Sequence, residues 1–381
     1  MIQKLKSEFL KEFNEAPDLI TRAPGRINLI GEHTDYNLGL VFPAAIDKSM
    51  YFAFKTNGTN SCRLCAYDKN EKVTIELDKM DADLLWAKYC VGVIQEVFAL
   101  GISLEGFDCL FMSDIPIGAG VSSSAALECG FVMGLNTLSN SNLDKWEMAK
   151  IGNRAENNYL GIQSGILDQF SSIFGLKNKA MLMDCASQDF TYHDVNIDPY
   201  TLVLINTNVK HSHLSSGYND RPSECRAALK IAQQQFSKIN SLSDLNKLQL
   251  ETIKTKLSET LYKRTLFVIE ENARVLLFKN ALKEKNYNAL GQLLYESHEG
   301  LETLYEVSCK ELNILVNLSR KEPSIKGARM MGGGFGGCTL NLIEIKNKEK
   351  IIESMCEAYF NKTGITAIPY YIHIGQGAEL L

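Results

Sequence analysis

The segment from Glu32 to Asp35 holds two carboxylates and an imidazole, side chains that hydrogen-bond hydroxyl groups and exchange protons. It follows an apolar run, residues 27–30, that ends at Gly31. A buried strand that ends in a polar turn presents several fixed partners to one polar ligand. Arg26 lies six residues before Glu32, an even spacing that would place both side chains on one face of a strand. The segment therefore predicts a clamp for a hydroxyl-rich ligand and a cation beside it.

A second segment, residues 116–126, has the composition of a phosphate-binding loop. It contains Gly118, Ala119, Gly120, Val121, Ser122, Ser123 and Ser124. Glycines let backbone N–H groups approach an anion, and serine hydroxyls add donors or an oxygen ligand for Mg²⁺. The segment lacks the Gly-Lys ending of a Walker A loop, and Ser123 replaces the third glycine of a Rossmann fingerprint. A glycine turn with a serine helix cap is the alternative interpretation.

A third segment, residues 332–337, has five glycines in six residues and leads into a predicted strand. Such a glycine-rich loop is typical of backbone that adopts positive φ angles or that a ligand approaches closely. A mobile hairpin turn is the alternative interpretation.

Two carboxylates in the middle of the chain are candidates for chemistry. Asp168 lies in a largely uncharged stretch and is either a helix cap or a charge held for a reaction. Glu156 lies twelve residues earlier, on a predicted helix. Taken alone, its side chain is expected to be solvated on the surface of that helix.

Bulk composition excludes several classes of partner. The 381 residues are 45% hydrophobic and 22% charged, with a net charge of −5 and no basic block, so neither nucleic acid nor an anionic membrane is expected to bind. No apolar run approaches the roughly 18 residues of a transmembrane helix, and the first 14 residues lack a signal-peptide core. We therefore expect a cytoplasmic protein, and a monomer, because no coiled-coil pattern or apolar helix face is evident.

Ten cysteines are too few for a disulfide scaffold in a chain of this length. Cys62 and Cys65 form a lone CxxC without a second pair or paired histidines, so we expect reduced core thiols rather than zinc or redox chemistry.

The elements that must position these residues are mixed helices and strands without a regular βαβ rhythm, which favours an α+β class. A hairpin is expected to close at residues 42–46, and a domain boundary is expected near residue 180, which gives domains 1–180 and 181–381. Helices are predicted at residues 1–13, 84–100, 122–139, 143–160, 166–177, within 222–318 and at 348–362; strands are predicted within 20–55 and 63–77 and at 106–113, 180–185, 201–207, 339–344 and 365–373.

Together, the three segments resemble the signature motifs of the GHMP small-molecule kinases and, within that superfamily, of the galactokinase family. Residues 24–43 resemble its sugar signature, 116–126 its ATP loop and 332–338 its third motif. Residues 208–212 with Ser215, Tyr218 and Asn219, residues 270–275 and residues 305–308 are similar as well. The resemblance extends from about residue 20 to residue 378. Met331 and Gly333 depart from it, since the family often has threonine and alanine there, and Leu38 occupies a variable site.

The resemblance implies a two-lobed α+β fold, with an N-terminal lobe like ribosomal protein S5 domain 2 and a ferredoxin-like C-terminal lobe. It implies transfer of the γ-phosphoryl group of ATP to the C1 hydroxyl of α-D-galactose. The residues implied are Glu32, His33, Thr34, Asp35, Gly165, Asp168 and Tyr218 for the sugar, residues 118–124 for the phosphates, Ser124 and Glu156 for Mg²⁺, and Trp86, Tyr67 and Asp68 near the adenine.

We hypothesise that Asp168 is the catalytic base and that Arg26 keeps it ionised. Two alternatives remain: a kinase for N-acetylgalactosamine, arabinose or a uronic acid, and a catalytically silent sensor of galactose and ATP. The uninterrupted ATP loop, with both Arg26 and Asp168 present, argues against the sensor.

Overall fold

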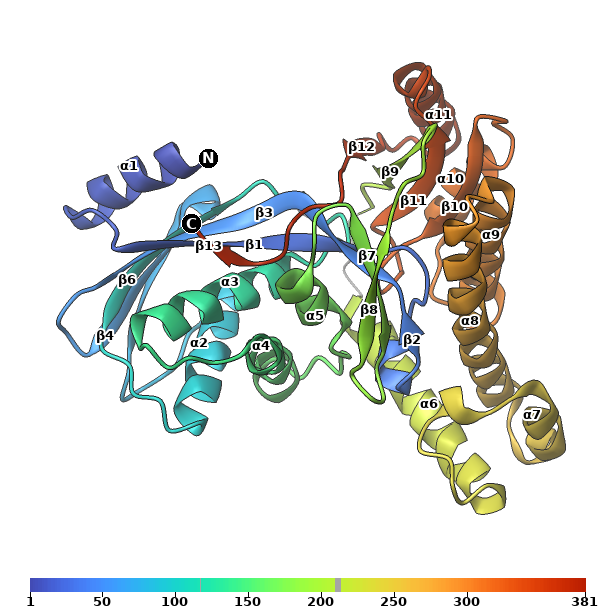
Figure 1. Ribbon diagram of the computed structural model, residues 1–381, viewed down its shortest axis with the longest axis horizontal. Helices are drawn as coiled ribbons and strands as arrows, with labels where there is room; N and C mark the ends of the chain where they lie inside the picture. Colours follow the sequence, from blue (N-terminus) through green and yellow to red (C-terminus); the bar gives the residue numbers. More distant parts are fainter. Residues whose placement is uncertain (117, 210–213) are drawn as a thin grey trace.

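The protein forms two lobes, as the computed structural model of residues 1–116, 118–209 and 214–381 shows (Figure 1). The lobe on the left carries both termini and contains a six-stranded sheet. Along the sheet, the strands are β13 (Glu379–Leu380), β1 (Leu19–Asn28), β3 (Pro43–Thr56), β6 (Phe107–Ser113), β4 (Ser61–Ala66) and β5 (Glu71–Glu76). The last strand of the chain thus pairs with the first, and the C-terminus returns to the N-terminal lobe.

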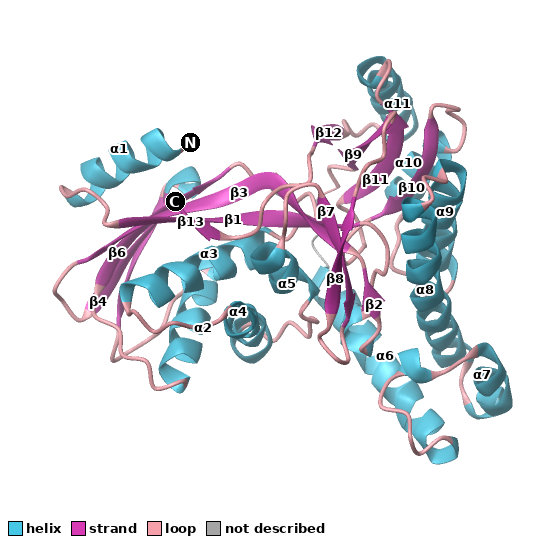
Figure 2. Cartoon of the chain, in the orientation of Figure 1, coloured by secondary structure: helices cyan, strands magenta, loops and turns pink. Residues whose placement is uncertain are grey.

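Helices cover both faces of this sheet (Figure 2). On one face, α1 (Ile2–Phe13) buries Leu5 and Phe9, which are four residues apart and so lie on one side of the helix. On the other face lie α2 (Leu85–Ala99), α3 (Ser123–Leu138), α4 (Lys145–Tyr159) and α5 (Leu167–Phe174).

Helix α3 packs on the sheet through two glycines. Phe52 and Phe54 point to the same face of β3, and each ring lies against one glycine of the helix, Gly130 or Gly134. Two residues of a strand and four residues of a helix span nearly the same length, so the two pairs are in register. This close approach positions α3 on the sheet, and the first residues of α3, Ser123 and Ser124, belong to the predicted phosphate loop.

A small sheet joins the two lobes. It consists of β2 (Leu40–Val41), β7 (Lys179–Asp184) and β8 (Phe190–Asp194). The largest cluster of buried apolar side chains continues past it, from the first sheet to residues such as Phe278 and Leu340 in the second lobe. A division at residue 180 remains a prediction.

The second lobe is a four-stranded antiparallel sheet with helices. The strand order is β10-β11-β9-β12, and one helix precedes β10 and another precedes β12, which is the split β-α-β-β-α-β pattern of ferredoxin-like folds. The strands are β9 (Tyr200–Asn206), β10 (Ile325–Met330), β11 (Cys338–Glu344) and β12 (Ile368–Tyr371), and the helices are α6 (Leu214–Gln235), α7 (Lys247–Ile253), α8 (Glu259–Lys283), α9 (Tyr287–Thr303), α10 (Lys310–Ser319) and α11 (Lys348–Thr363). Short 3-10 helices occur at Asp35–Asn37, Tyr67–Lys69, Leu242–Asp244 and Lys254–Lys256.

The α+β class and the two lobes are confirmed, and most predicted elements lie within a few residues of their observed bounds. The hairpin expected to close at residues 42–46 is present as an antiparallel pair: residues 43–45, at the start of the long strand β3, pair with the end of β1, although a long loop separates the two strands. Strands β8 and β10 were not predicted, and α6 begins before the predicted helical region.

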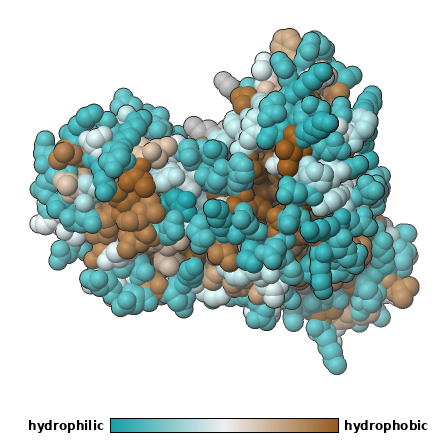
Figure 3. All heavy atoms as spheres, turned by 45° about the horizontal axis from the view of Figure 1, so that its top comes forward, coloured by the Kyte–Doolittle hydropathy of each residue, from teal (hydrophilic) through white to brown (hydrophobic). Residues whose placement is uncertain are grey.

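The surface in Figure 3 is mainly hydrophilic, with apolar side chains gathered over the left lobe and toward the middle. Among the described residues, no helix has the length and hydrophobicity needed to cross a membrane. All ten cysteines are free, and burial raises the pKa of Cys62, in the lone CxxC, to about 12.

We predict that Gly130→Ala destabilises the fold, because the new β carbon would come within 2.2 Å of the Phe52 ring. Overpacking of this kind costs about 1–3 kcal/mol. Urea unfolding of the variant measures the loss, and Thr137→Ala on the same helix serves as the control. An unchanged free energy of unfolding for Gly130→Ala would contradict the glycine contact.

Candidate active site

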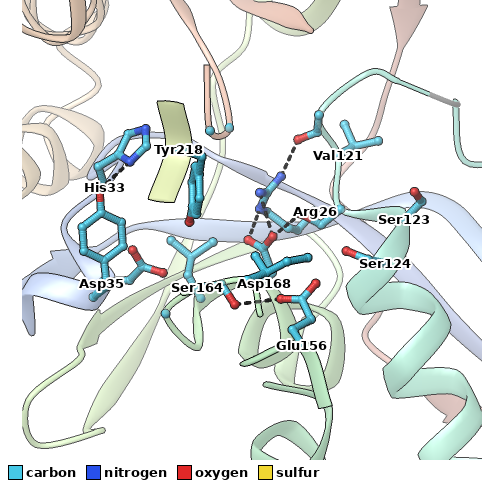
Figure 4. A pocket seen from close by; sticks show the side chains of 18 of the residues that line it. Arg26, His33, Asp35, Val121, Ser123, Ser124, Glu156, Ser164, Asp168 and Tyr218 are labelled. Atoms are coloured by element: carbon cyan, nitrogen blue, oxygen red, sulfur yellow. Dashed lines mark hydrogen bonds and ion pairs between the residues drawn. The ribbon is translucent and has the colours of Figure 1, made fainter. Parts of the chain in front are cut away.

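Segments far apart in the sequence meet around one cavity of about 520 Å³ (Figure 4). It is lined by residues from the loop after β1, the loop before α3, the end of α4 and the start of α5, α6 and the third glycine segment. The lining includes Arg26, Glu32, His33, Asp35, Gly118, Gly120, Val121, Ser122, Ser123, Ser124, Glu156, Gly165, Asp168, Tyr218, Gly332 and Gly333. Most of the residues predicted from the three motifs are therefore brought together.

Arg26 and Asp168 form a two-pronged ion pair at the centre of this cavity. Arg26 Nε lies 2.7 Å from Asp168 Oδ1, and Arg26 Nη2 lies 3.1 Å from Oδ2. The pairing of β1 with β3 shifts register between Pro24 and Arg26. Such an irregularity re-aims a side chain. Burial alone would lower the pKa of Arg26, but the charge of Asp168 raises it, so the guanidinium stays charged.

The loop before α3 is tied to the same ion pair. Arg26 Nη1 donates to Gly120 O at 2.7 Å, and the backbone N–H of Arg26 donates to Val121 O at 3.0 Å. Ser122 has a left-handed φ of 56°, and its hydroxyl donates to Asp168 rather than capping α3. A serine thus occupies the N-cap position of α3, as the alternative interpretation has it, but its side chain does not cap the helix. Asp168 does not cap α5 either, because it lies within the helix and the cap position is Ile166.

The opposite side of the cavity is polar and aromatic. Asp35 lies against Gly165, where a β carbon would come within 2.2 Å of Asp35 Oδ2, so only glycine fits there. His33 Nδ1 is 2.7 Å from the Tyr36 hydroxyl, and the His33 and Tyr218 ring centres are 5.7 Å apart. Among the residues that the structure describes, none makes a hydrogen bond to the buried His33 Nε2. A polar ligand would satisfy that nitrogen.

Burial sets the charge of two of these groups. Desolvation and the charge of Arg221 lower the pKa of His33 to about 3, so the imidazole is neutral at neutral pH. Desolvation and the charge of Asp168 raise the pKa of Asp35 to about 7. Strongly shifted groups in one cavity are typical of a functional site.

Glu32 is held by Arg329, a residue that the sequence analysis did not single out. Arg329 is fully buried, and its Nη2 lies 2.6 Å from Glu32 Oε2. The other oxygen, Glu32 Oε1, accepts the backbone N–H of Gly332 at 2.8 Å. Glu32 therefore joins the first segment to the third as well as lining the cavity. An arginine inside the apolar strand β10, just before the glycine cluster, is the signal that could have revealed it.

Glu156 lies in the cavity close to the serine loop. It is only 5% exposed, so the solvated position favoured by the sequence is wrong. Burial and the charge of Asp168 raise the pKa of Glu156, while the hydroxyls of Ser164 and Ser124 lower it. Among the described side chains, no cluster of three His, Cys, Asp or Glu residues is placed to hold a metal ion.

Five predicted residues do not line the cavity: Thr34, Ala119, Trp86, Tyr67 and Asp68. Thr34 is buried, with its hydroxyl 2.8 Å from Gly31 O and 2.7 Å from Leu40 O, and Ala119 is buried in the core. Trp86 Nε1 donates to Glu71 Oε2 at 2.6 Å, and Asp68 Oδ2 accepts from Ser113 N at 2.7 Å. Thr34, Trp86 and Asp68 thus use their polar groups within the protein. The similar segment at residues 210–212 lies outside the described residues.

The two-lobed fold, with an anion-suited glycine-serine loop beside a polar clamp, defines the class of GHMP kinases. The chain matches the GHMP kinases N-terminal domain over residues 87–176 and the C-terminal domain over residues 278–361. The mevalonate kinase of Methanococcus jannaschii has the same fold, with a TM-score of 0.65 and 19% identity over 94% of this chain and 98% of that one.

The comparisons define the family further. Residues 7–56 match the galactokinase galactose-binding signature. The chain is 38% identical to a Thermotoga maritima galactokinase over 94% of this chain and 99% of its relative, and 36% identical to a Clostridium perfringens galactokinase over 99% and 98%. The crystal structure of Lactococcus lactis galactokinase complexed with galactose superposes with a TM-score of 0.96 at 34% identity and covers both chains fully. The chain belongs to the galactokinase family.

We predict that Asp35→Asn stabilises the protein at high pH. The folded-state pKa of about 7 lies above the ordinary 3.8, so the folded carboxyl favours its proton and the wild type loses stability as pH rises through 7. The asparagine side chain cannot ionise. The free energy of unfolding of the variant, relative to that of the wild type, should therefore rise by about 1 kcal/mol from about pH 5 to about pH 8, after allowance for solvent that reaches the site. Urea unfolding at both values measures this, and an advantage independent of pH would contradict it.

Proposed function

We propose that this chain transfers the γ-phosphoryl group of ATP to the C1 hydroxyl of α-D-galactose and yields galactose 1-phosphate and ADP. The observation that carries the proposal is the position of Asp168, which Arg26 holds between the polar clamp and the serine loop of one cavity. The galactokinase family membership of the whole chain supports the same reaction.

The polar clamp would bind the sugar. Asp35 offers carboxylate oxygens to sugar hydroxyls, and neutral His33 offers a buried nitrogen that has no partner in the described part of the chain. Gly165 leaves room for Asp35, and Tyr218 closes the clamp from α6. A site of buried polar groups rejects a sugar that leaves them unpaired far more strongly than an apolar pocket would.

The serine loop would bind the nucleotide phosphates. Gly118 and Gly120 have positive φ angles, and Ser123 and Ser124 form the start of α3, whose N-terminus favours an anion. The Ser124 hydroxyl and the Glu156 carboxylate are hard oxygen donors that suit Mg²⁺, an ion that binds few protein ligands and shares the phosphates. Bound there, Mg²⁺ would neutralise charge on the phosphate oxygens.

Asp168 would act on the attacking hydroxyl. As the oxygen on C1 forms its bond to the γ-phosphorus, the bond from that phosphorus to the leaving oxygen of ADP breaks, and the hydroxyl proton passes to Asp168. Arg26 and Ser122 hold the carboxylate in one orientation and place positive charge beside the reacting oxygen. Positioning and charge neutralisation supply most of the catalysis in phosphoryl transfer.

Two further expectations belong with this proposal. Ten free cysteines suit a reducing compartment, which supports a cytoplasmic enzyme. A monomer remains our expectation, because the cavity is completed by residues of one chain.

Replacing Asp168 with Asn should lower kcat by about 10²–10⁴, because the amide cannot take up the proton. Its shape is retained, so the KM for galactose should change much less. Steady-state kinetics measures both constants, with Asp194→Asn, on exposed strand β8, as the control. A near-normal kcat would show that Asp168 is not the base.

A coupled assay of ADP release distinguishes galactose from the alternative substrates. With MgATP, galactose should give the highest kcat/KM in a panel that includes N-acetylgalactosamine, arabinose and a uronic acid. A preference for another sugar in the panel would reassign the substrate. Binding of both galactose and ATP without ADP release would support the silent sensor instead.

A further inference from the structure

Helix α8 contacts both ends of the loop that carries the sugar-binding side chains. The backbone N–H of Gly31 donates to Glu271 Oε1 at 2.9 Å, and the backbone N–H of Leu40 donates to Asn272 Oδ1 at 2.6 Å. Glu271 and Asn272 are adjacent on the helix, so one short stretch of α8 holds the first and last residues of the loop. Neither side chain lines the cavity.

Glu271 is suited to a fixed position rather than to chemistry. It is fully buried, and its Oε1 also accepts from the Ser297 hydroxyl at 2.8 Å, while its Oε2 pairs with Arg274 Nη1 at 2.6 Å. A buried carboxylate with a cation and several donors is held in one orientation. The Gly31 end of the loop is thereby anchored to α8 and α9.

The loop backbone lies directly against these anchors. Gly31 has a φ of +91°, and a β carbon there would come within 2.7 Å of Leu40 O and 2.9 Å of Val275 Cγ2. At Gly39, a β carbon would come within 3.0 Å of Asn272 Oδ1. The Thr34 hydroxyl, close to Gly31 O and Leu40 O, joins the two ends from within. The close contacts leave the loop little freedom to move away from the helix.

We propose that Glu271 and Asn272 are positioning residues that set galactose affinity by fixing residues 31–40, without touching the sugar. The inference rests on the proposed function, because it assigns sugar binding to that loop. His33 and Asp35 reach the cavity from residues 31–40, whereas the serine loop is tied to Arg26 and makes no hydrogen bond to α8 among the described residues. Loss of the hydrogen bonds from Glu271 or Asn272 to residues 31–40 should therefore weaken sugar binding and leave nucleotide binding nearly unchanged.

Asn272→Leu tests the proposal, because leucine has a similar size but no acceptor for the Leu40 N–H. We expect a rise of about 10-fold or more in the KM for galactose, a change of at most about twofold in the KM for MgATP, and a largely retained kcat. Asn272→Asp keeps an acceptor oxygen and should restore the galactose KM. Asn280→Leu, the same substitution at an exposed position of α8, is the matched control.

Calorimetric titration of galactose into each variant without ATP separates this proposal from the reaction itself. If the wild type binds galactose but does not phosphorylate it, the proposed function is overturned. The positioning role of Glu271 and Asn272 is then still tested by the galactose affinities of the variants. Three outcomes would overturn the positioning role of Glu271 and Asn272. These are an unchanged galactose affinity in Asn272→Leu, equal losses of affinity for galactose and ATP, and a failure of Asn272→Asp to restore the galactose KM. If Asn272→Leu does not fold, Asn272→Ala removes the same acceptor and is subject to the same criteria.

Discussion

The buried ion pair between Arg329 and Glu32 is the constraint on which the arrangement of the site depends. Burying two charges costs more than their attraction returns unless further hydrogen bonds satisfy the remaining donors and acceptors. Arg329 meets this condition: it donates to Leu29 O at 3.0 Å, to Met330 O at 2.8 Å and to Asn28 O. The end of β1 and the end of β10, about 300 residues apart in sequence, are thus held by one side chain.

The walls of the cavity follow from this pair through a chain of contacts. Glu32 accepts from the N–H of Gly332, and Gly332 lies against the serine loop, where a β carbon would come within 3.1 Å of Gly120 O. Gly120 O accepts from Arg26, and Arg26 holds Asp168. The third glycine segment therefore acts as the spacer between the serine loop and residues 31–40. Gly332 has a φ of +82°, a conformation that favours glycine, and a β carbon there would crowd Gly120 O.

The mixed pattern of helices and strands predicted the α+β class, and the resemblance to the galactokinase family implied the two lobes and most of the residues that line the cavity. Glycine runs, serines before a helix and a carboxylate after an apolar strand report local backbone and hydrogen-bonding needs, which a single segment reveals. The even spacing of Arg26 and Glu32 predicted that both side chains lie on one face of a strand. Both do line the cavity, but not for that reason, because β1 ends at Asn28 and the chain turns at Gly31 before it reaches Glu32. Arg329, Glu271 and Asn272 were not predicted as site residues. Residues 270–275 resembled the family and an arginine in an apolar strand marked Arg329, but neither local signal reveals the contacts across the fold that give these residues their importance. Thr34 shows the converse, since matching a motif does not say which way a side chain points.

A double-mutant cycle on Arg329 and Glu32 tests the account most directly. The free energy of unfolding would be measured in urea for the wild type, Arg329→Met, Glu32→Gln and the double variant. Each single change leaves a buried group without its partner and should cost about 3 kcal/mol or more. The double variant should cost little more than the worse single one, which corresponds to a coupling of about 2 kcal/mol or more. Costs that add to within about 0.5 kcal/mol would show that the pair does not hold the two segments together.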